Sequence, residues 1–131
     1  MTSFTLDALN NMTPAEFAAA LGDICEHSPW VALAAANKRP FATVNALHDG
    51  LMDVIREQSE VDRIAFLRAH PELAGLQARA GTLTADSTTE QASLGLANMP
   101  RTDTERFAEL NAAYGRRFGF PFIICVRHHT R

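Results

Sequence analysis

The stretch FLRAHPELAG, residues 66–75, places a histidine directly before a proline at the end of an amphipathic segment. Pro71 has no backbone N–H and disfavours helical geometry at the residue before it, so a helix is predicted to end at His70. A protonated histidine at a helix C-terminus also interacts favourably with the helix dipole, by ~0.3–1 kcal/mol. The spacing alone therefore favours a helix stop at His70 over a reactive imidazole, and both interpretations stay open.

Helix signals recur before this stretch and indicate an all-α fold. TPAE at 13–16 combines an N-cap threonine, a proline at the first helical position and a glutamate at the third, which makes a capping box. HSPW at 27–30 repeats the cap with a serine and a proline, and it opens a second helix that Pro40 must stop. Thr43 and Ser59 can cap a third and a fourth helix, in which apolar residues recur at helical spacing.

The second half of the chain is predicted to add two helices after a less regular loop. Scattered glycines and threonines over residues 72–86 indicate that loop, which has room for one helical turn. STTE at 87–90 forms another capping box, and a longer helix after Pro100 should end at Gly119. The apolar run FPFIICV, 120–126, reads as core, either as buried extended chain or as the start of a helix.

Length and composition indicate one soluble globular domain. The chain has 131 residues, of which 47% are hydrophobic, and a net charge of −3 without a basic stripe, which argues against nucleic-acid binding. No stretch reaches the ~18 apolar residues of a membrane span, and residues 1–25 lack the pattern of a secretion signal. Cys25 and Cys125 form no zinc motif and are predicted to be buried thiols, so we expect a cytoplasmic protein.

Other polar residues have structural explanations as well. Glu90 occupies the third position of a predicted capping box, where its carboxylate would accept from the backbone N–H of Ser87. Gln91 is of the residue type that usually lies on a solvated helix surface. The histidines show neither the i, i+4 nor the HxH spacing of a metal site, and no nucleophile elbow or glycine-rich phosphate loop is present. The residue pattern predicts no metal centre and leaves the function open.

Three segments taken together carry a family resemblance. They are HPELAG at 70–75, STTEQ at 87–91 and RFGFPFIICVR at 117–127, and EHSPWVALAAANKRPF at 26–41 precedes them. In this order and separation they resemble the OHCU decarboxylase family, across most of the chain. OHCU abbreviates 2-oxo-4-hydroxy-4-carboxy-5-ureidoimidazoline, an intermediate between urate and allantoin.

The resemblance implies a fold and an activity. It implies an all-α, single-domain helical bundle over residues 1–131 that works as a homodimer without a metal or an organic cofactor. It also implies an enzyme, a carboxy-lyase that converts OHCU to (S)-allantoin in purine catabolism. The family normally continues into one or two further helices, which can contribute an arginine near the site, and this chain is expected to lack those helices.

The resemblance also implies which residues form the site. The family's catalytic histidine falls on His70, its neighbouring proline on Pro71 and its acidic partner on Glu90. The substrate-binding positions besides Pro71 fall on two runs, Ser87, Thr88, Thr89, Glu90 and Gln91, and Phe122, Ile123, Ile124, Cys125 and Val126.

The chemistry of the implied reaction suits a histidine. Loss of CO₂ leaves an electron pair that many decarboxylases place on a cofactor. The ring of OHCU has a C=N bond beside the carboxylated carbon, and this bond can accept the electron pair. The protein therefore need only bind and orient the substrate and then protonate a carbon of its ring from one face. Histidine side chains, with an ordinary pKa of ~6.5, hold or give a proton near neutrality, which suits His70 to the role of donor.

The two binding runs offer complementary contacts. Ser87, Glu90 and Gln91 are spaced i, i+3, i+4 and share one helix face, predicted to lie in the first turn, where the positive helix end could hold a carboxylate. Glu90 could accept N–H bonds from the substrate or fix the tautomer of His70. If residues 122–126 are extended, their backbone groups could pair with the ring amides of the substrate.

Two other classes of function stay open beside the enzyme. A non-catalytic helical module could bind a purine-derived ring in the same pocket, although it would need no proton donor at His70. A helical protein-interaction domain would need no shared polar face at Ser87, Glu90 and Gln91.

Overall fold

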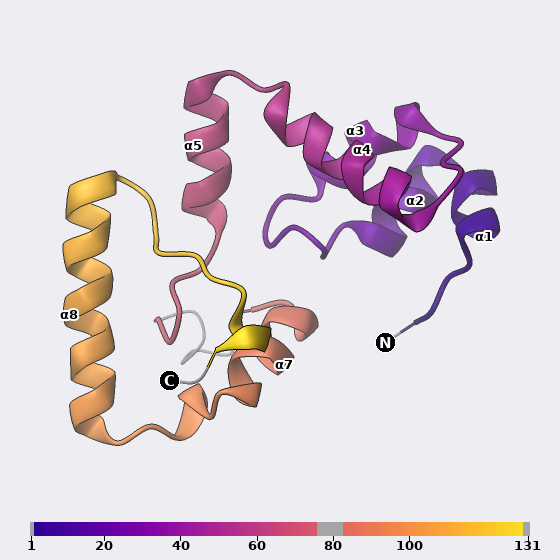
Figure 1. The fold of residues 1–131 in the computed structure, drawn as a ribbon. Helices are drawn as coiled ribbons and strands as arrows, with labels where there is room; N and C mark the ends of the chain where they lie inside the picture. The colour runs from indigo at the N-terminus through magenta and orange to yellow at the C-terminus, as the bar shows by residue number, and fades with distance from the viewer. Residues whose placement is uncertain (1, 76–82, 130–131) are drawn as a thin grey trace. The chain divides into compact units, whose positions relative to one another are not determined.

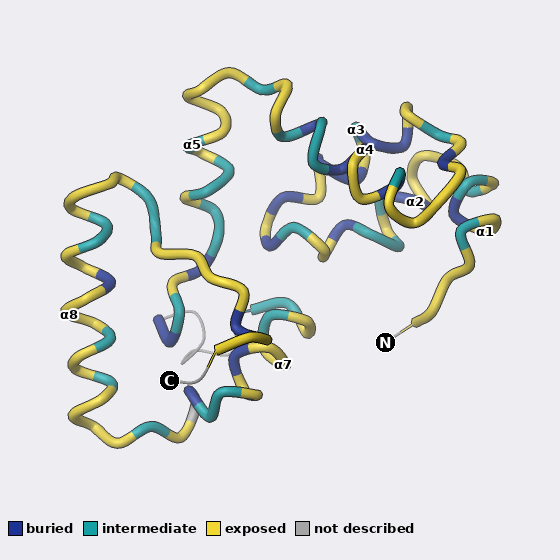
Figure 2. The backbone as a smooth tube through the Cα atoms, viewed as in Figure 1, coloured by how far each residue is buried: buried dark blue, intermediate teal, exposed yellow. Residues whose placement is uncertain are grey.

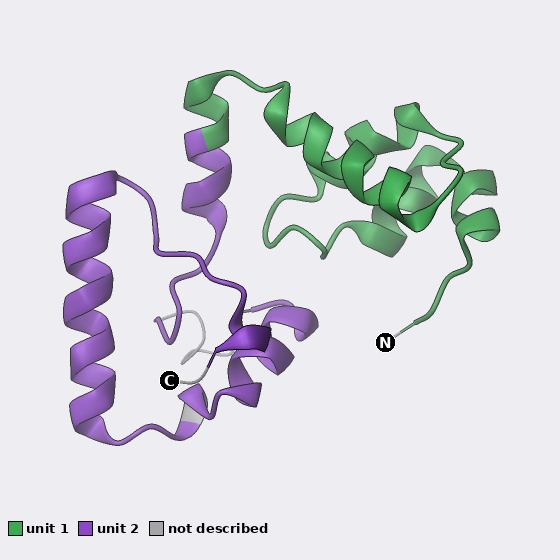
Figure 3. Cartoon of the chain, viewed as in Figure 1, with its two compact units in different colours: residues 1–63 green, residues 64–131 purple. Residues whose placement is uncertain are grey.

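The computed structural model describes residues 2–75 and 83–129, and these ranges contain helices and no strand, which confirms the all-α prediction (Figure 1). The chain divides into two compact units, residues 1–63 and 64–131 (Figure 3). That residues 1–131 act as one domain stays a prediction. None of the helices in the described ranges is long and apolar enough to cross a membrane.

Caps that the sequence predicts organise unit 1, residues 1–63. At the start of α2, the Glu16 N–H donates to the Thr13 hydroxyl over 3.3 Å, and the Thr13 N–H donates to the Glu16 carboxylate over 2.8 Å. The bond from the Thr13 backbone, joined by one from its hydroxyl, lowers the pKa of Glu16. Thr43 caps α4 as predicted. The helices of this unit are α1 Leu6–Asn11, α2 Pro14–Leu21, α3 Trp30–Ala35, η1 Ala36–Lys38 and α4 Val44–Arg56.

Two details of unit 1 differ from the predictions. Helix α1, which Thr5 caps, is not predicted from the sequence, because its six residues are too few for a periodic pattern. The predicted cap at Ser28 is wrong, because α3 begins at Trp30 and has no side-chain cap bond. The N-cap position is occupied by Pro29. Ser28, one residue before it, is buried, and its backbone carbonyl accepts from the Val31 N–H over 3.1 Å.

The core of unit 1 centres on Phe17, which is fully buried and lies 6.4 Å from the Phe41 ring, centroid to centroid. Buried residues also recur along α3 and α4 (Figure 2). A Cβ at Gly50 would lie 2.6 Å from Phe41 Cε1, so this helical position has to be glycine for the ring to fit. The Arg39 guanidinium lies 4.9 Å from the Phe17 centroid and donates to the Leu9 carbonyl over 2.9 Å. Arg39 therefore joins a helix end to the aromatic core.

In unit 2, residues 64–131, the predicted helix ends are confirmed. Helix α5 begins after Ser59, whose hydroxyl accepts from the Asp62 N–H, and it ends directly before His70. Helix α8 ends at Gly119, which has a left-handed φ of +78° and donates to the Gly115 carbonyl over 2.9 Å. The helices here are α5 Glu60–Ala69, which spans the boundary with unit 1, α7 Ala85–Ser93, η2 Leu96–Asn98, α8 Arg101–Phe118 and η3 Val126–His128.

Helix α7 begins earlier than the sequence predicts. Its N-cap is Thr84, whose side chain accepts from the Ser87 N–H over 3.4 Å, and its first residue is Ala85. The predicted capping box of Ser87 and Glu90 is therefore wrong, because Ser87 is already the third helical residue. Glu90 lies in the middle of the helix and caps nothing.

The segment after α8 is not core, contrary to the prediction. Phe122, Ile123 and Ile124 are 37%, 40% and 36% exposed, and Val126 alone among residues 120–126 is buried. Residues 121–125 have no regular secondary structure, and the Phe122 ring lies 5.3 Å from that of Tyr114 on α8. An aromatic contact thus holds this segment against α8 and leaves much of its apolar surface uncovered.

The two thiols also differ from the prediction that both are buried. Cys125 belongs to the exposed segment and is itself exposed, whereas Cys25 is half-buried. Burial raises the pKa of the Cys25 thiol.

The position of the α7 cap can be tested with two identical changes in one helix. We expect Thr84→Ala to lower the free energy of unfolding by about 1 kcal/mol, because it removes an N-cap. Thr88→Ala should leave it unchanged or slightly higher, because alanine is the better helix former inside a helix. Urea unfolding followed by far-ultraviolet circular dichroism measures both. Equal losses from the two changes would contradict the observed helix start.

Candidate active site

The candidate site is built around His70, at the end of α5. Its backbone N–H donates to the Leu67 carbonyl over 3.2 Å, and its side chain is half-buried. Nδ1 of the imidazole lies 2.9 Å from the Pro71 carbonyl oxygen. Because a carbonyl only accepts, Nδ1 must carry the hydrogen of this bond, which leaves Nε2 as the nitrogen that can exchange a proton with a ligand.

A small cavity joins the three segments that carry the family resemblance. It has a volume of about 50 Å³ and lies between the end of α5, one face of α7 and the chain after α8. Figure 1 shows the last of these segments returning from α8 past the end of α5 to α7. The lining residues are His70, Pro71, Leu73, Ser87, Glu90, Gln91, Phe122, Ile123, Ile124 and Val126.

All but three of the residues predicted for the site line this cavity. Ser87, Glu90 and Gln91 share one face of α7, as their spacing predicts, but they lie beyond the first turn, so the helix N-terminus is not beside them. Thr88, Thr89 and Cys125 are exposed and are not among its lining residues, and the Thr89 hydroxyl donates to the Ala85 carbonyl over 2.9 Å.

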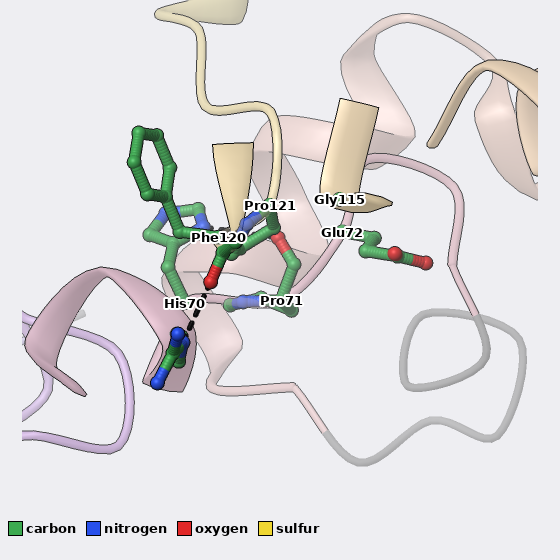
Figure 4. Close-up of a pocket in the computed structure, with 8 residues that line it drawn as sticks. His70, Pro71, Glu72, Gly115, Phe120 and Pro121 are labelled. Carbon is green, nitrogen blue, oxygen red and sulfur yellow. Dashed lines mark hydrogen bonds between the residues drawn. The ribbon is translucent and has the colours of Figure 1, made fainter. Parts of the chain in front are cut away.

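A larger cavity of about 450 Å³ lies on another side of the same histidine. Its volume falls in the usual range for small-molecule sites, about 300–1,000 Å³. Figure 4 shows His70 and Pro71 beside Phe120 and Pro121, with Glu72 near Gly115. The remaining two lining residues are Arg68 and Gly119.

His70 and Pro71 line both cavities. The small cavity holds the polar face of α7, whereas the large one has the volume that a ligand needs. Arg68 borders the large cavity, and its Nε donates to the Gly119 carbonyl over 2.6 Å, which ties the end of α5 to the end of α8. A ligand in contact with the imidazole can therefore draw on polar groups from α7 and on the open space beside Phe120.

The turn after His70 is held by two side chains, one of which the sequence analysis missed. The Ala74 N–H donates to Gln91 Oε1 over 2.9 Å, and Asn111 Nδ2 donates to the Leu73 carbonyl over 2.9 Å. Gln91 and Asn111 are both buried. The only signal for Asn111 in the sequence is a polar residue within a long helix, which is too common to single it out.

Metal ligands do not gather in this part of the protein. Within residues 2–75 and 83–129 there is no group of three or more histidine, cysteine, aspartate or glutamate side chains that could hold a metal ion.

Comparison with known proteins places the chain in a family. The sequence model of the OHCU decarboxylase family matches residues 10–131. The 2-oxo-4-hydroxy-4-carboxy-5-ureidoimidazoline decarboxylase of Halalkalicoccus jeotgali is 36% identical over 130 residues, which cover 99% of this chain and 72% of that protein. The enzyme of the same name from Haloferax volcanii is 38% identical over 127 residues, 97% of this chain and 73% of that protein.

A solved structure gives the same result for the fold. The crystal structure of (S)-allantoin synthase is similar to this chain with a TM-score of 0.72 and 29% sequence identity. The match covers 98% of this chain, which spans 40% of that longer protein. The family model covers nearly the whole chain, and the three segments that carry the resemblance meet at the small cavity beside His70. The chain therefore belongs to the OHCU decarboxylase family.

Proposed function

We propose that this protein releases CO₂ from OHCU to form (S)-allantoin, with His70 as the proton donor. Membership in the family makes the protein a carboxy-lyase of urate breakdown. The name of the similar (S)-allantoin synthase supports the handedness of the product. The observation that carries the role of His70 is the cavity in which its imidazole meets the polar face of α7 and the segment after α8.

The reaction requires that one ring carbon of the substrate gain a proton. When the bond to the carboxylate breaks, CO₂ leaves and its bonding electron pair moves toward the adjacent ring C=N bond. The nitrogen of that bond takes up a proton, and the resulting enol becomes allantoin when its hydroxyl loses a proton and the former C=N carbon, which carries the ureido group, gains one. Addition of that proton from one face gives one enantiomer. The Nδ1–H bond to the Pro71 carbonyl holds the imidazole of His70, so the protonated ring presents Nε2–H as the donor.

Glu90 is the second residue that we place in the mechanism. Glu90 does not cap the helix, because α7 begins at Ala85 and its N-cap is Thr84. A carboxylate that borders the cavity beside His70 can accept N–H bonds from the ureido group or orient the imidazole. Ser87 and Gln91 lie on the same face and can bind the polar edge of the substrate.

The segment after α8 supplies the other wall of the proposed substrate site. Phe122, Ile123 and Ile124 line the cavity with apolar surface, and Cys125 has extended backbone geometry. An irregular, extended segment leaves backbone N–H and C=O groups outside any helix or sheet ladder. We therefore infer that these groups recognise the ring amides of the substrate.

The role of His70 can be tested by substitution with asparagine, which is tolerated near helix ends. We expect His70→Asn to fold normally and to lose ~10²–10⁴-fold in kcat, the usual worth of a general acid or base. The decay of freshly generated OHCU, followed by its ultraviolet absorbance, measures the rate. His48→Asn, the same change at an exposed histidine, should leave the rate unchanged. A folded His70→Asn protein with the wild-type rate would return His70 to a purely structural role.

The role of Glu90 can be tested with an isosteric change. We expect Glu90→Gln to lower kcat at least tenfold, because it removes a charge that orients the imidazole or the substrate, and to leave the free energy of unfolding unchanged. Glu105→Gln on α8 is the control, because its ion pair with Arg101 is exposed and such pairs contribute little. Steady-state kinetics and urea unfolding are both needed. Normal kinetics in a folded Glu90→Gln protein would remove Glu90 from the mechanism.

We also infer that the protein is a cytoplasmic homodimer. The family resemblance is the basis for the dimer, and two free cysteines, one of them exposed, suit a reducing compartment. Light scattering during gel filtration should give twice the mass of one 14.3 kDa chain at micromolar concentration. A mass of one chain under these conditions would contradict the dimer.

A further inference from the structure

Helix α8 buries a polar residue where an apolar one is usual. All eighteen residues of α8 belong to the described part of the chain, and Asn111 is the only one of them that is buried, at 6% exposure. Its apolar neighbour Leu110 is 52% exposed. Helices normally bury an apolar stripe, and burying an amide is unfavourable unless it forms hydrogen bonds. The bond that Asn111 makes, rather than its packing, therefore accounts for its position.

That bond is one half of a clamp on a single peptide group. Asn111 Nδ2 donates to the Leu73 carbonyl oxygen, and the N–H of the same peptide group, which belongs to Ala74, donates to Gln91 Oε1, each over 2.9 Å. Gln91 comes from α7 and Asn111 from α8. Two buried amides thus hold one peptide plane at both of its polar ends, which fixes its orientation.

The backbone at this point would not hold its conformation alone. Ala74 has a φ of +54°, in the left-handed region that non-glycine residues avoid. Such a conformation persists when the surrounding structure over-determines it, and these residues cluster at functional sites. The two amide bonds supply that determination.

The clamp lies between the two proposed catalytic residues. Leu73 lines the small cavity and lies three residues after His70, in a turn that the Gly75 N–H closes by donating to the Glu72 carbonyl over 3.1 Å. At the other end, Gln91 is the next residue after Glu90. Holding the Leu73–Ala74 peptide therefore sets the distance between the turn that carries the imidazole and the helix that carries the carboxylate.

We propose that Asn111 is a positioning residue of the decarboxylase, which acts through His70 by clamping the Leu73–Ala74 peptide together with Gln91. The proposal rests on the proposed function of His70. Asn111 itself is not a lining residue of either cavity, so it touches no substrate there. Its loss should therefore lower kcat through misplacement of the imidazole, since small displacements of a catalytic group can cost on the order of 10²-fold in rate.

The test combines Asn111→Leu, which removes the donor at similar size, with His70→Asn in a double-mutant cycle. We expect Asn111→Leu to lower kcat about 10–100-fold in the full chain with KM changed less than threefold. In the His70→Asn background, Asn111→Leu should cost less than twofold further, because the group it positions is already gone. A second variant, Asn111→Asp, keeps the shape of the side chain but places an acceptor against the Leu73 carbonyl. Its control is Asn45→Asp, the same change at an exposed helical asparagine.

Each outcome separates the clamp from the proposed function. Additive losses in the cycle, or a folded Asn111→Leu protein with normal kcat, would overturn the clamp while leaving His70 in place. If Asn111→Leu does not fold, the same cycle with Asn111→Asp decides. Loss of the folded state in both variants would make Asn111 a residue of the fold and overturn the proposal. Wild-type turnover in His70→Asn would overturn the proposed function itself.

Discussion

The proline after His70 is the constraint from which the site follows. Because Pro71 lacks an N–H and disfavours helical geometry at the residue before it, α5 ends at Ala69 and the chain turns sharply over residues 70–75. The turn brings Ala74 to a positive φ and buries a peptide group whose polar ends must be satisfied. Helices α7 and α8 supply the partners for that group, so the elements that complete the site are also those that complete this turn.

The two units reach a folded core in different ways. In unit 1, apolar side chains pack around Phe17, and the half-buried Arg39 joins the end of α1 to this core. In unit 2, the buried apolar residues among those described are Pro71, Ala74, Leu96 and Val126, and the amides of Gln91 and Asn111 are buried beside them. The apolar residues 122–124 stay partly exposed because they border a cavity. Buried amide hydrogen bonds therefore set the geometry of unit 2. In unit 1, apolar packing makes the larger contribution to the core.

Local chemistry decided which features could be predicted from sequence. The ends of α5 and α8 and the capping box at Thr13 depend on residues within one or two turns, and they are confirmed. The predicted start of α7 is wrong because Thr84 and Ser87 both have the chemistry of an N-cap, and the residue pattern that follows fits a helix from either one. Asn111 was missed because its partner, Leu73, is 38 residues away. The residues alone left the function open, and the order of three segments indicated the family.

The account predicts that one imidazole adds one proton from one face, and the handedness of the product tests this most directly. Allantoin formed from freshly generated OHCU should be followed by circular dichroism, with and without the protein. Water can protonate either face, so the spontaneous reaction should give a racemate without a signal. The account predicts a signal of (S)-allantoin that grows at the enzymatic rate. Rapid release of CO₂ with racemic allantoin would contradict it, since the proton would then come from solvent rather than from His70.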